Sequence, residues 1–201
     1  KELVDAQLAP WESQIETLMY PKQMQSTARA AAILYIRLMD YEDLDPSERK
    51  EFEISSAIAY LQSGQARKAL NYFSYVDMDA LTPDQLALTK YYQGLAALSV
   101  GGEDNARLAL EAFQQTMNRP LANHISAKMR HDCLLRFALA SSLLNSELAL
   151  NAIRRYLKHP AFTTPERILI AKLLHADVMF TKGLYRESAA EARALSADGS
   201  F

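Results

Sequence analysis

Histidine and cysteine carry much of the metal-binding and nucleophilic chemistry of proteins, and this chain has four histidines and one cysteine. His124 and His131 are seven residues apart and would share one face of a helix, and Cys133 follows close behind. A helical zinc site needs i, i+4 spacing or converging Cys and His side chains, and neither is present. Residues one or two apart on a helix do not face each other, so His131 cannot serve Cys133 as a base. We therefore expect structural histidines, on the surface or between helices, and a buried cysteine.

Carboxylates offer a second possible chemistry. Glu42, Asp43 and Asp45 form a short acidic cluster, but it lacks the alternating ligands and the central glycine of an EF-hand loop. The chain has no glycine-rich phosphate loop, no Gly-x-Ser-x-Gly and no His-Glu-x-x-His motif. The sequence accordingly predicts a protein that is not an enzyme and that uses no metal or cofactor.

Composition narrows the class of protein further. The 201 residues are 49% hydrophobic and 23% charged, which is typical of a folded chain rather than a disordered one. The net charge of −2 disfavours a nucleic-acid partner, which usually requires a basic face. The longest apolar run, 30–36, is far shorter than the roughly 20 residues of a membrane span. We expect a soluble domain without a transmembrane segment, from the cytoplasm or the periplasm, excised or processed because it begins with Lys1.

Prolines mark the predicted starts of helices along the chain. In three places a residue suited to an N-cap directly precedes a proline, and proline is suited to the first helical position. The cap residues are Asp45, Thr82 and Thr164. The first two also have Glu or Gln at the third helical position, which completes a capping box. These caps are 37 and 82 residues apart, and 82 is twice 41. A period of about 40 residues predicts two-helix repeats, with a further cap at Asn123.

Hydrophobic periodicity and the short connections predict consecutive helices that run antiparallel to their neighbours. The scarcity of glycine, six in the whole chain, agrees with an all-α fold. The predicted helices are 2–9, 11–20, 23–40, 46–63, 65–77, 83–99, 104–117, 124–144, 147–158, 165–182 and 184–197.

One segment carries a recognisable repeat pattern. Small Ala57 and aromatic Tyr60 lie on one helix, Gly64 ends it, and small Ala69 with aromatic Phe73 lies on the next. This pattern resembles the tetratricopeptide repeat. Similar but weaker sets follow: Gly94, Ala97, Gly101, Ala109 and Phe113; Ala140, Leu143, Ala152 and Tyr156; Ala176, Met179, Gly183, Ser188 and Ala192.

The resemblance implies an all-α fold, a right-handed superhelical stack of antiparallel helix pairs in a single domain over 1–201, which is a tetratricopeptide-like α-solenoid. Four helix-pair repeats would follow divergent leading helices. The leading helices occupy 1–45, and the repeats occupy 46–81, 82–122, 123–163 and 164–198.

In the family, the first helices of successive pairs line a concave face that binds partners. Carried over to this sequence, the resemblance implies a partner-binding groove that is apolar and aromatic, with a few amides and one acid. The same side chains could instead be core packing between helices, the commoner role of an apolar stripe. The residues are Ile58, Leu61, Gln62, Leu88, Tyr91, Leu95, Leu98, Phe137, Ser141, Asn145, Leu173, Asp177 and Phe180.

These observations predict a scaffold that binds a helical or extended segment of a partner protein. An alternative is a sensing domain that holds a small molecule or peptide inside the superhelix, with Gln62, Ser141, Asn145 and Asp177 as polar anchors. An all-α hydrolase or transferase ranks last. Self-association through the last repeat is a further possibility, because its apolar residues would be exposed if no capping helix follows. Those residues are Leu184, Ala192 and Leu195.

Overall fold

The computed structural model describes residues 22–41, 43–145, 147–159 and 162–197. Within these ranges every α-helix predicted from the sequence is present and no strand is found, so the described part of the chain is all-helical. The predicted helices at 2–9 and 11–20 lie outside the described residues. The chain divides between Gly101 and Gly102 into two compact units, which we describe separately.

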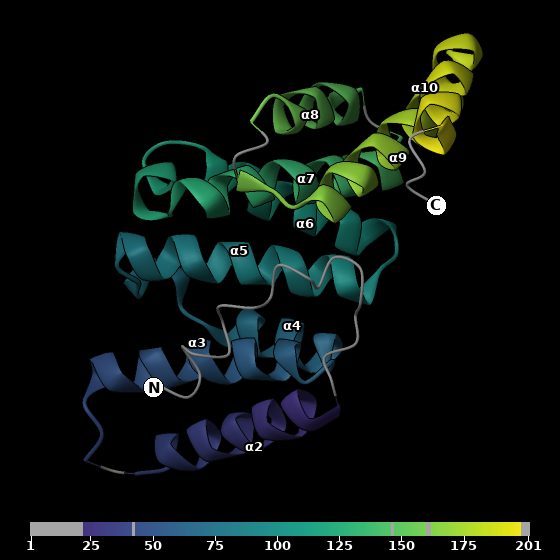
Figure 1. The fold of residues 1–201 in the computed structure, drawn as a ribbon. Coiled ribbons are helices and arrows are strands. Elements are labelled where there is room, and N and C mark those ends of the chain that lie inside the picture. The colour runs from purple at the N-terminus through teal and green to yellow at the C-terminus, as the bar shows by residue number, and fades with distance from the viewer. Residues whose placement is uncertain (1–21, 42, 146, 160–161, 198–201) are drawn as a thin grey trace. The chain divides into compact units, whose positions relative to one another are not determined.

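In the first unit, consecutive helices pack against each other, and α3 also touches α5 (Figure 1). Each helix boundary falls within a few residues of its predicted position. The unit also contains one 3₁₀ turn, η2, that the sequence did not indicate. The elements are α2 (Lys22–Met39), α3 (Pro46–Gln62), α4 (Ala66–Tyr75), η2 (Met78–Ala80) and α5 (Pro83–Val100).

The second unit repeats this arrangement, with each helix packed on the next and α7 also touching α9. Its helices again match the predicted ones, except at the start of α7. The elements are α6 (Glu103–Met117), η3 (Leu121–His124), α7 (Ala127–Leu143), α8 (Leu148–Leu157), α9 (Pro165–Thr181) and α10 (Tyr185–Ala197).

The three proline-marked helix starts are confirmed. The Asp45 carboxylate accepts a hydrogen bond from the Ser47 amide at 2.7 Å, at the start of α3. Thr82 forms a reciprocal capping box with Gln85 at the start of α5. Thr164 accepts from the amide of Arg167 at the start of α9. Each cap satisfies an amide that has no partner inside its helix.

The predicted cap at Asn123 is wrong. The N-cap of α7 is Ser126, whose hydroxyl accepts from the Met129 amide at 3.1 Å. Residues 121–124 form a separate 3₁₀ turn, and the Arg130 guanidinium donates to the carbonyl of Ala122 at 2.7 Å. Because that side chain satisfies the turn's carbonyl, the turn is stable without joining the helix. His124 and His131 therefore do not share a helix.

α3 and α9 are each followed by a glycine in the left-handed conformation that ends the helix. At Gly64, φ is +76°, and the amides of Gly64 and Gln65 donate back to Leu61 and Tyr60 in a Schellman motif. Gly183 closes α9 in the same way, with φ of +79°. After α7 the sequence has no glycine, and Asn145 adopts the left-handed conformation there with φ of +55°. Asparagine tolerates this conformation better than other non-glycine residues.

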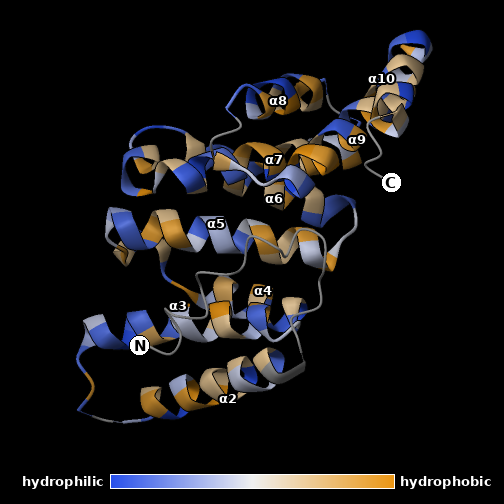
Figure 2. Ribbon diagram, viewed as in Figure 1, coloured by the Kyte–Doolittle hydropathy of each residue, from blue (hydrophilic) through white to orange (hydrophobic). Residues whose placement is uncertain are grey.

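The core pairs small and aromatic side chains, as the repeat pattern predicted. Ala57, Ala69 and Phe73 are fully buried in the first unit, with Tyr60 beside them. Tyr60 stacks on Tyr72 with their ring centroids 5.1 Å apart. In Figure 2 the helices carry both hydrophilic and hydrophobic residues, as expected of helices that bury one face. The alanines allow the helices to approach closely, and the aromatic rings fill the space between them.

Candidate functional site

Most of the groove residues predicted in the first unit are core side chains. Ile58, Gln62, Tyr91 and Leu95 are buried. The others, Leu61, Leu88 and Leu98, are half-buried. A buried side chain cannot contact a partner unless the helices rearrange, so an open partner surface has to be sought elsewhere.

In the second unit the predicted residues divide differently. Phe137 and Ser141 on α7 are buried, whereas Asn145, Asp177 and Phe180 are exposed. The exposed fraction of Phe180 is 58%, a large value for a phenylalanine.

Exposed residues follow one face of α9. Leu173, Asp177 and Phe180 are spaced i, i+4 and i+7, so they lie above one another on the helix. Leu184 and Tyr185 continue this surface into the start of α10, and the rings of Phe180 and Tyr185 meet edge to face at 5.2 Å. We call these five residues the α9 surface.

A lysine links a further predicted residue, Asn145, to the end of α9. The ammonium of Lys182, at the C-cap of α9, donates to the Asn145 carbonyl and to the Glu147 carboxylate, both at 2.7 Å. The turn after α7 is thus held against the end of α9. Asn145 therefore lies near the end of the helix that carries Leu173, Asp177 and Phe180, which were also proposed from the sequence.

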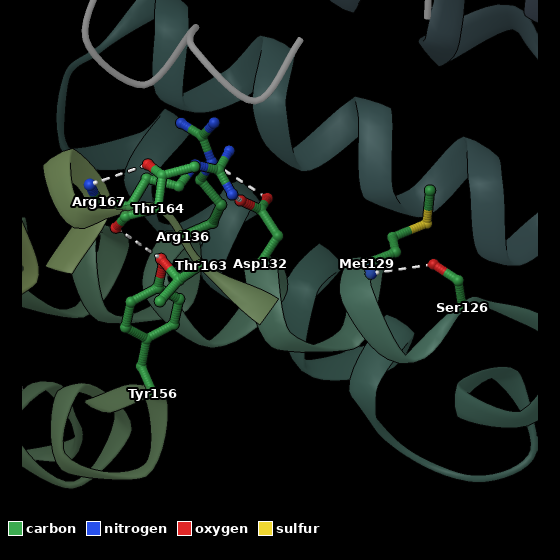
Figure 3. A network of polar contacts seen from close by, with 8 residues as sticks. All are labelled: Ser126, Met129, Asp132, Arg136, Tyr156, Thr163, Thr164 and Arg167. Carbon is green, nitrogen blue, oxygen red and sulfur yellow. Dashed lines mark hydrogen bonds and ion pairs between the residues drawn. The ribbon is translucent and has the colours of Figure 1, made fainter. Parts of the chain in front are cut away.

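The sequence did not reveal a buried ion cluster in this unit. The Asp132 carboxylate lies 2.9 Å from the Arg167 guanidinium and 3.3 Å from that of Arg136, and all three side chains are buried (Figure 3). Asp132 and Arg136 are spaced i, i+4 on α7, which is the one signal that the sequence offered. Arg167 comes from the first turn of α9, so the cluster joins α7 to α9.

Tyr156 of α8 lies beside this cluster and ties the α8–α9 connection down. Its hydroxyl forms a hydrogen bond with that of Thr163, the residue before the α9 cap (Figure 3). Burial raises the pKa of Tyr156, although the Thr163 hydrogen bond acts in the opposite direction. The phenol therefore stays neutral. We interpret the cluster and Tyr156 as the interior support that orients α9 and its exposed surface.

His131 of α7 lies between helices, which is one of the two positions expected from the sequence. Its Nε2 atom is 2.8 Å from the Tyr156 carbonyl oxygen, and its ring stacks on that of Tyr156. Because a carbonyl can only accept, Nε2 carries the proton. Burial lowers the pKa of His131, which keeps the imidazole neutral.

His131 also lines a pocket of about 310 Å³ between the ends of α6, α7 and α8. We call it the basic pocket because arginine, lysine and histidine make up more than half of its lining. The lining residues are Met117, Ala127, Arg130, His131, Leu134, Arg155, Lys158, His159 and Phe162.

Cys133 is fully buried, as expected. Burial raises the pKa of its thiol well above the ordinary value, and the nearby Asp132 carboxylate adds to the effect. A thiol that stays protonated is a poor nucleophile. The side chain acts as a small apolar group in the core.

A wider groove of about 630 Å³ runs between α2 and α3 in the first unit. Its lining is mainly apolar, with two glutamates. The lining residues are Thr27, Ala30, Ala31, Leu34, Tyr35, Leu38, Glu48, Glu51, Phe52 and Ser55. Neither this groove nor the basic pocket is lined by the four polar anchors considered for a ligand inside the superhelix.

Comparison with other proteins adds no relative. No protein-family model, curated protein or solved structure matches this chain. Among the described residues, no helix has the length and apolarity to cross a bilayer. In the same part of the chain, no three His, Cys, Asp or Glu side chains are grouped to hold a metal ion.

Proposed function

We propose that the chain is a protein-interaction module built of tetratricopeptide-like helix pairs in a superhelical stack, and that the α9 surface docks an amphipathic segment of a partner. The observation that carries this proposal is the exposed row of Leu173, Asp177 and Phe180, continued by Leu184 and Tyr185. Single exposed apolar residues are common on proteins, but contiguous ones are typical of binding sites.

The position of α9 in its unit supports this assignment. The corresponding residues of α7, Phe137 and Ser141, are buried, whereas those of α9 are open. Of these two equivalent faces, the one on α9 is open among the described residues, and it is therefore the one that a partner can contact.

The chemistry of the surface defines the partner. Apolar side chains at i and i+7 suit the apolar face of another helix, and the ring pair Phe180–Tyr185 offers an aromatic anchor. Asp177 lies between the apolar residues and is exposed. A partner segment with a lysine or arginine among its apolar residues would pair with it and fix the register.

A photo-crosslinking experiment tests the proposal. The crosslinker p-benzoylphenylalanine is placed at Phe180 in one variant and at Tyr75 of α4 in another, and each is irradiated in its native cell extract. Tyr75 is a matched control because it is also an exposed aromatic residue, on the other unit. We expect one dominant adduct at position 180 and none at 75, and mass spectrometry should place it in an amphipathic basic segment.

Other outcomes would count against the proposal. Equal adducts at both positions would show nonspecific contact. An adduct between two copies of this chain would assign the surface to self-association instead. In that case Leu184 contributes, whereas Leu195, which the sequence also suggested, is buried.

A further inference from the structure

The charged side chains that line the basic pocket are all positive. Arg130, Arg155 and Lys158 line it together with two histidines, and no aspartate or glutamate of the described ranges does. Among the described residues, Arg155 and Lys158 form no ion pair with a carboxylate. Three cationic side chains thus face one small cavity without a neutralising partner on its wall.

Helix electrostatics accounts for only part of this charge. Arg155 and Lys158 lie at the C-terminal end of α8, where positive charge stabilises the helix dipole. Arg130 lies close to the N-terminal end of α7, where positive charge is unfavourable. Its guanidinium is fixed by a hydrogen bond to the Ala122 carbonyl at 2.7 Å. The arginine is therefore held at the pocket against the preference of its own helix.

The rest of the pocket wall is apolar or aromatic. Met117, Leu134 and Phe162 line it, and the ring centroid of Phe162 lies 5.8 Å from that of His131. His131 is only 5% exposed, and its Nδ1 atom has no hydrogen-bond partner among the described residues. A buried polar atom without a partner is uncommon in folded proteins and often marks a functional position.

We propose that the basic pocket binds a small organic anion, a carboxylate or phosphate joined to a planar ring. The anionic group contacts Arg130, Arg155 and Lys158, and the ring lies against His131 and Phe162. Arginine is suited to both acidic groups because its guanidinium matches their geometry. The volume of about 310 Å³ is at the lower end of the range of ligand pockets, about 300–1,000 Å³. It fits a small molecule rather than a helix.

This site is distinct from the proposed partner surface. None of the five residues of the α9 surface lines the pocket. The two proposals can therefore fail separately, and Phe180→Ala should leave ligand binding unchanged.

Calorimetry with defined probes tests the inference. Phenyl phosphate and benzoate represent the proposed class. Inorganic phosphate lacks the ring, and benzyl alcohol lacks the charge. We expect one of the two ring anions to bind with 1:1 stoichiometry and at least tenfold more tightly than either comparator. The His131 ring resonances should shift on binding.

Substitutions locate the binding. Arg155→Gln and Lys158→Gln should each weaken binding at least tenfold. Arg154→Gln is the matched control, because Arg154 is the exposed neighbour on α8 that does not line the pocket, and it should change binding less than twofold. All three side chains are exposed, so the variants should fold, and circular dichroism verifies this.

Several results would overturn the inference. Failure of both ring anions to bind would do so, as would equal weakening by Arg154→Gln and Arg155→Gln. Binding of inorganic phosphate as tight as that of phenyl phosphate would mean that the ring has no role. Binding to phosphatidic acid vesicles without binding to either free probe would assign the charge to a membrane surface.

Discussion

The imidazole of His131 stacks on the ring of Tyr156 with their centroids 4.1 Å apart, and its Nε2 atom donates to the carbonyl oxygen of that same tyrosine. One residue of α7 thus binds both the side chain and the backbone of one residue of α8. Burial at this contact keeps the imidazole neutral.

The neutral state of His131 predicts a pH dependence of stability. Its pKa in the folded protein is below the ordinary 6.5, chiefly through burial. The hydrogen bond to the Tyr156 carbonyl and the Asp132 carboxylate oppose this shift, whereas nearby His159 and Arg167 add to it. The unfolded chain therefore takes up the proton first as pH falls. The free energy of unfolding should decrease below pH 6.5, by at most about 1.4 kcal/mol per pH unit from this residue.

Urea denaturation between pH 7.5 and 5.5 measures this effect in the wild type and in His131→Phe. The phenylalanine keeps the stacked ring but cannot titrate. We expect a shallower decrease of stability with acidification in the variant, even though it loses the hydrogen bond to Tyr156. Identical pH profiles would contradict the assignment.

The buried ion cluster predicts a large loss of stability when its carboxylate is removed. Asp132→Asn removes the carboxylate that pairs with the buried guanidinium groups of Arg136 and Arg167, and breaking a buried ion pair typically costs about 3–5 kcal/mol. Glu147→Gln removes the exposed carboxylate that pairs with Lys182 and should cost less than about 1 kcal/mol. Chemical denaturation compares the two. Similar small losses would show that the cluster contributes no more than a surface pair.

The burial of Cys133 predicts slow alkylation. Iodoacetamide reacts with the thiolate. In the folded protein the raised pKa lowers the thiolate fraction, and burial keeps the reagent from the sulfur. At pH 8 the native protein should remain unmodified for hours, whereas the urea-unfolded chain should react within minutes. Mass spectrometry follows the reaction, and rapid labelling of the native protein would show that α7 is accessible there.

The helix ends make opposite predictions for two substitutions. Gly64→Ala places a side chain at φ of +76°, which should destabilise the protein by about 1–2 kcal/mol, although an added Cβ would make only an ordinary contact, with Gln25 Nε2 at 3.9 Å. Asn145→Gly relieves the same conformation and should leave stability unchanged or raise it by up to about 1 kcal/mol. Thermal unfolding measures both. A stabilising Gly64→Ala would contradict the described turn.

Particular residues show how far the sequence could predict the structure. Asp45, Thr82 and Thr164 located helix starts because a cap followed by proline acts locally. Asn123 failed as a cap because the side chain of Arg130, eight residues beyond Ala122, stabilises a competing turn. Asn145 adopts the left-handed conformation after α7, as glycine does after α3 and α9, because asparagine tolerates it better than other non-glycine residues.

The functional surfaces were harder to predict than the helices. The family resemblance placed Tyr91 and Phe180 in the same predicted groove, yet one is fully buried and the other mostly exposed. Burial depends on which helices pack against a face, and periodicity within one helix does not contain that information. For the same reason the cluster of Asp132 with Arg167 was missed, since the two are 35 residues apart in the chain.

Charge reversal at the α9 surface tests register as well as affinity. Asp177→Lys should weaken binding of the crosslinked partner segment at least tenfold, because it places like charges opposite each other. Replacing the facing lysine or arginine of that segment by glutamate should restore binding to the variant. Fluorescence anisotropy of the labelled segment measures both, and a variant that binds as tightly as the wild type would show that Asp177 does not face the partner's basic residue.

The role of the α9 surface in partner binding is tested most directly by a titration. The crosslinked partner segment, as a synthetic peptide, is titrated against the wild type, Phe180→Ala and Tyr75→Ala. Because central aromatic residues contribute much of the binding energy of an interface, we expect the peptide to bind Phe180→Ala at least about tenfold more weakly than the wild type. Tyr75→Ala should match the wild type. Equal affinities for all three proteins would contradict the assignment of the α9 surface as the partner site.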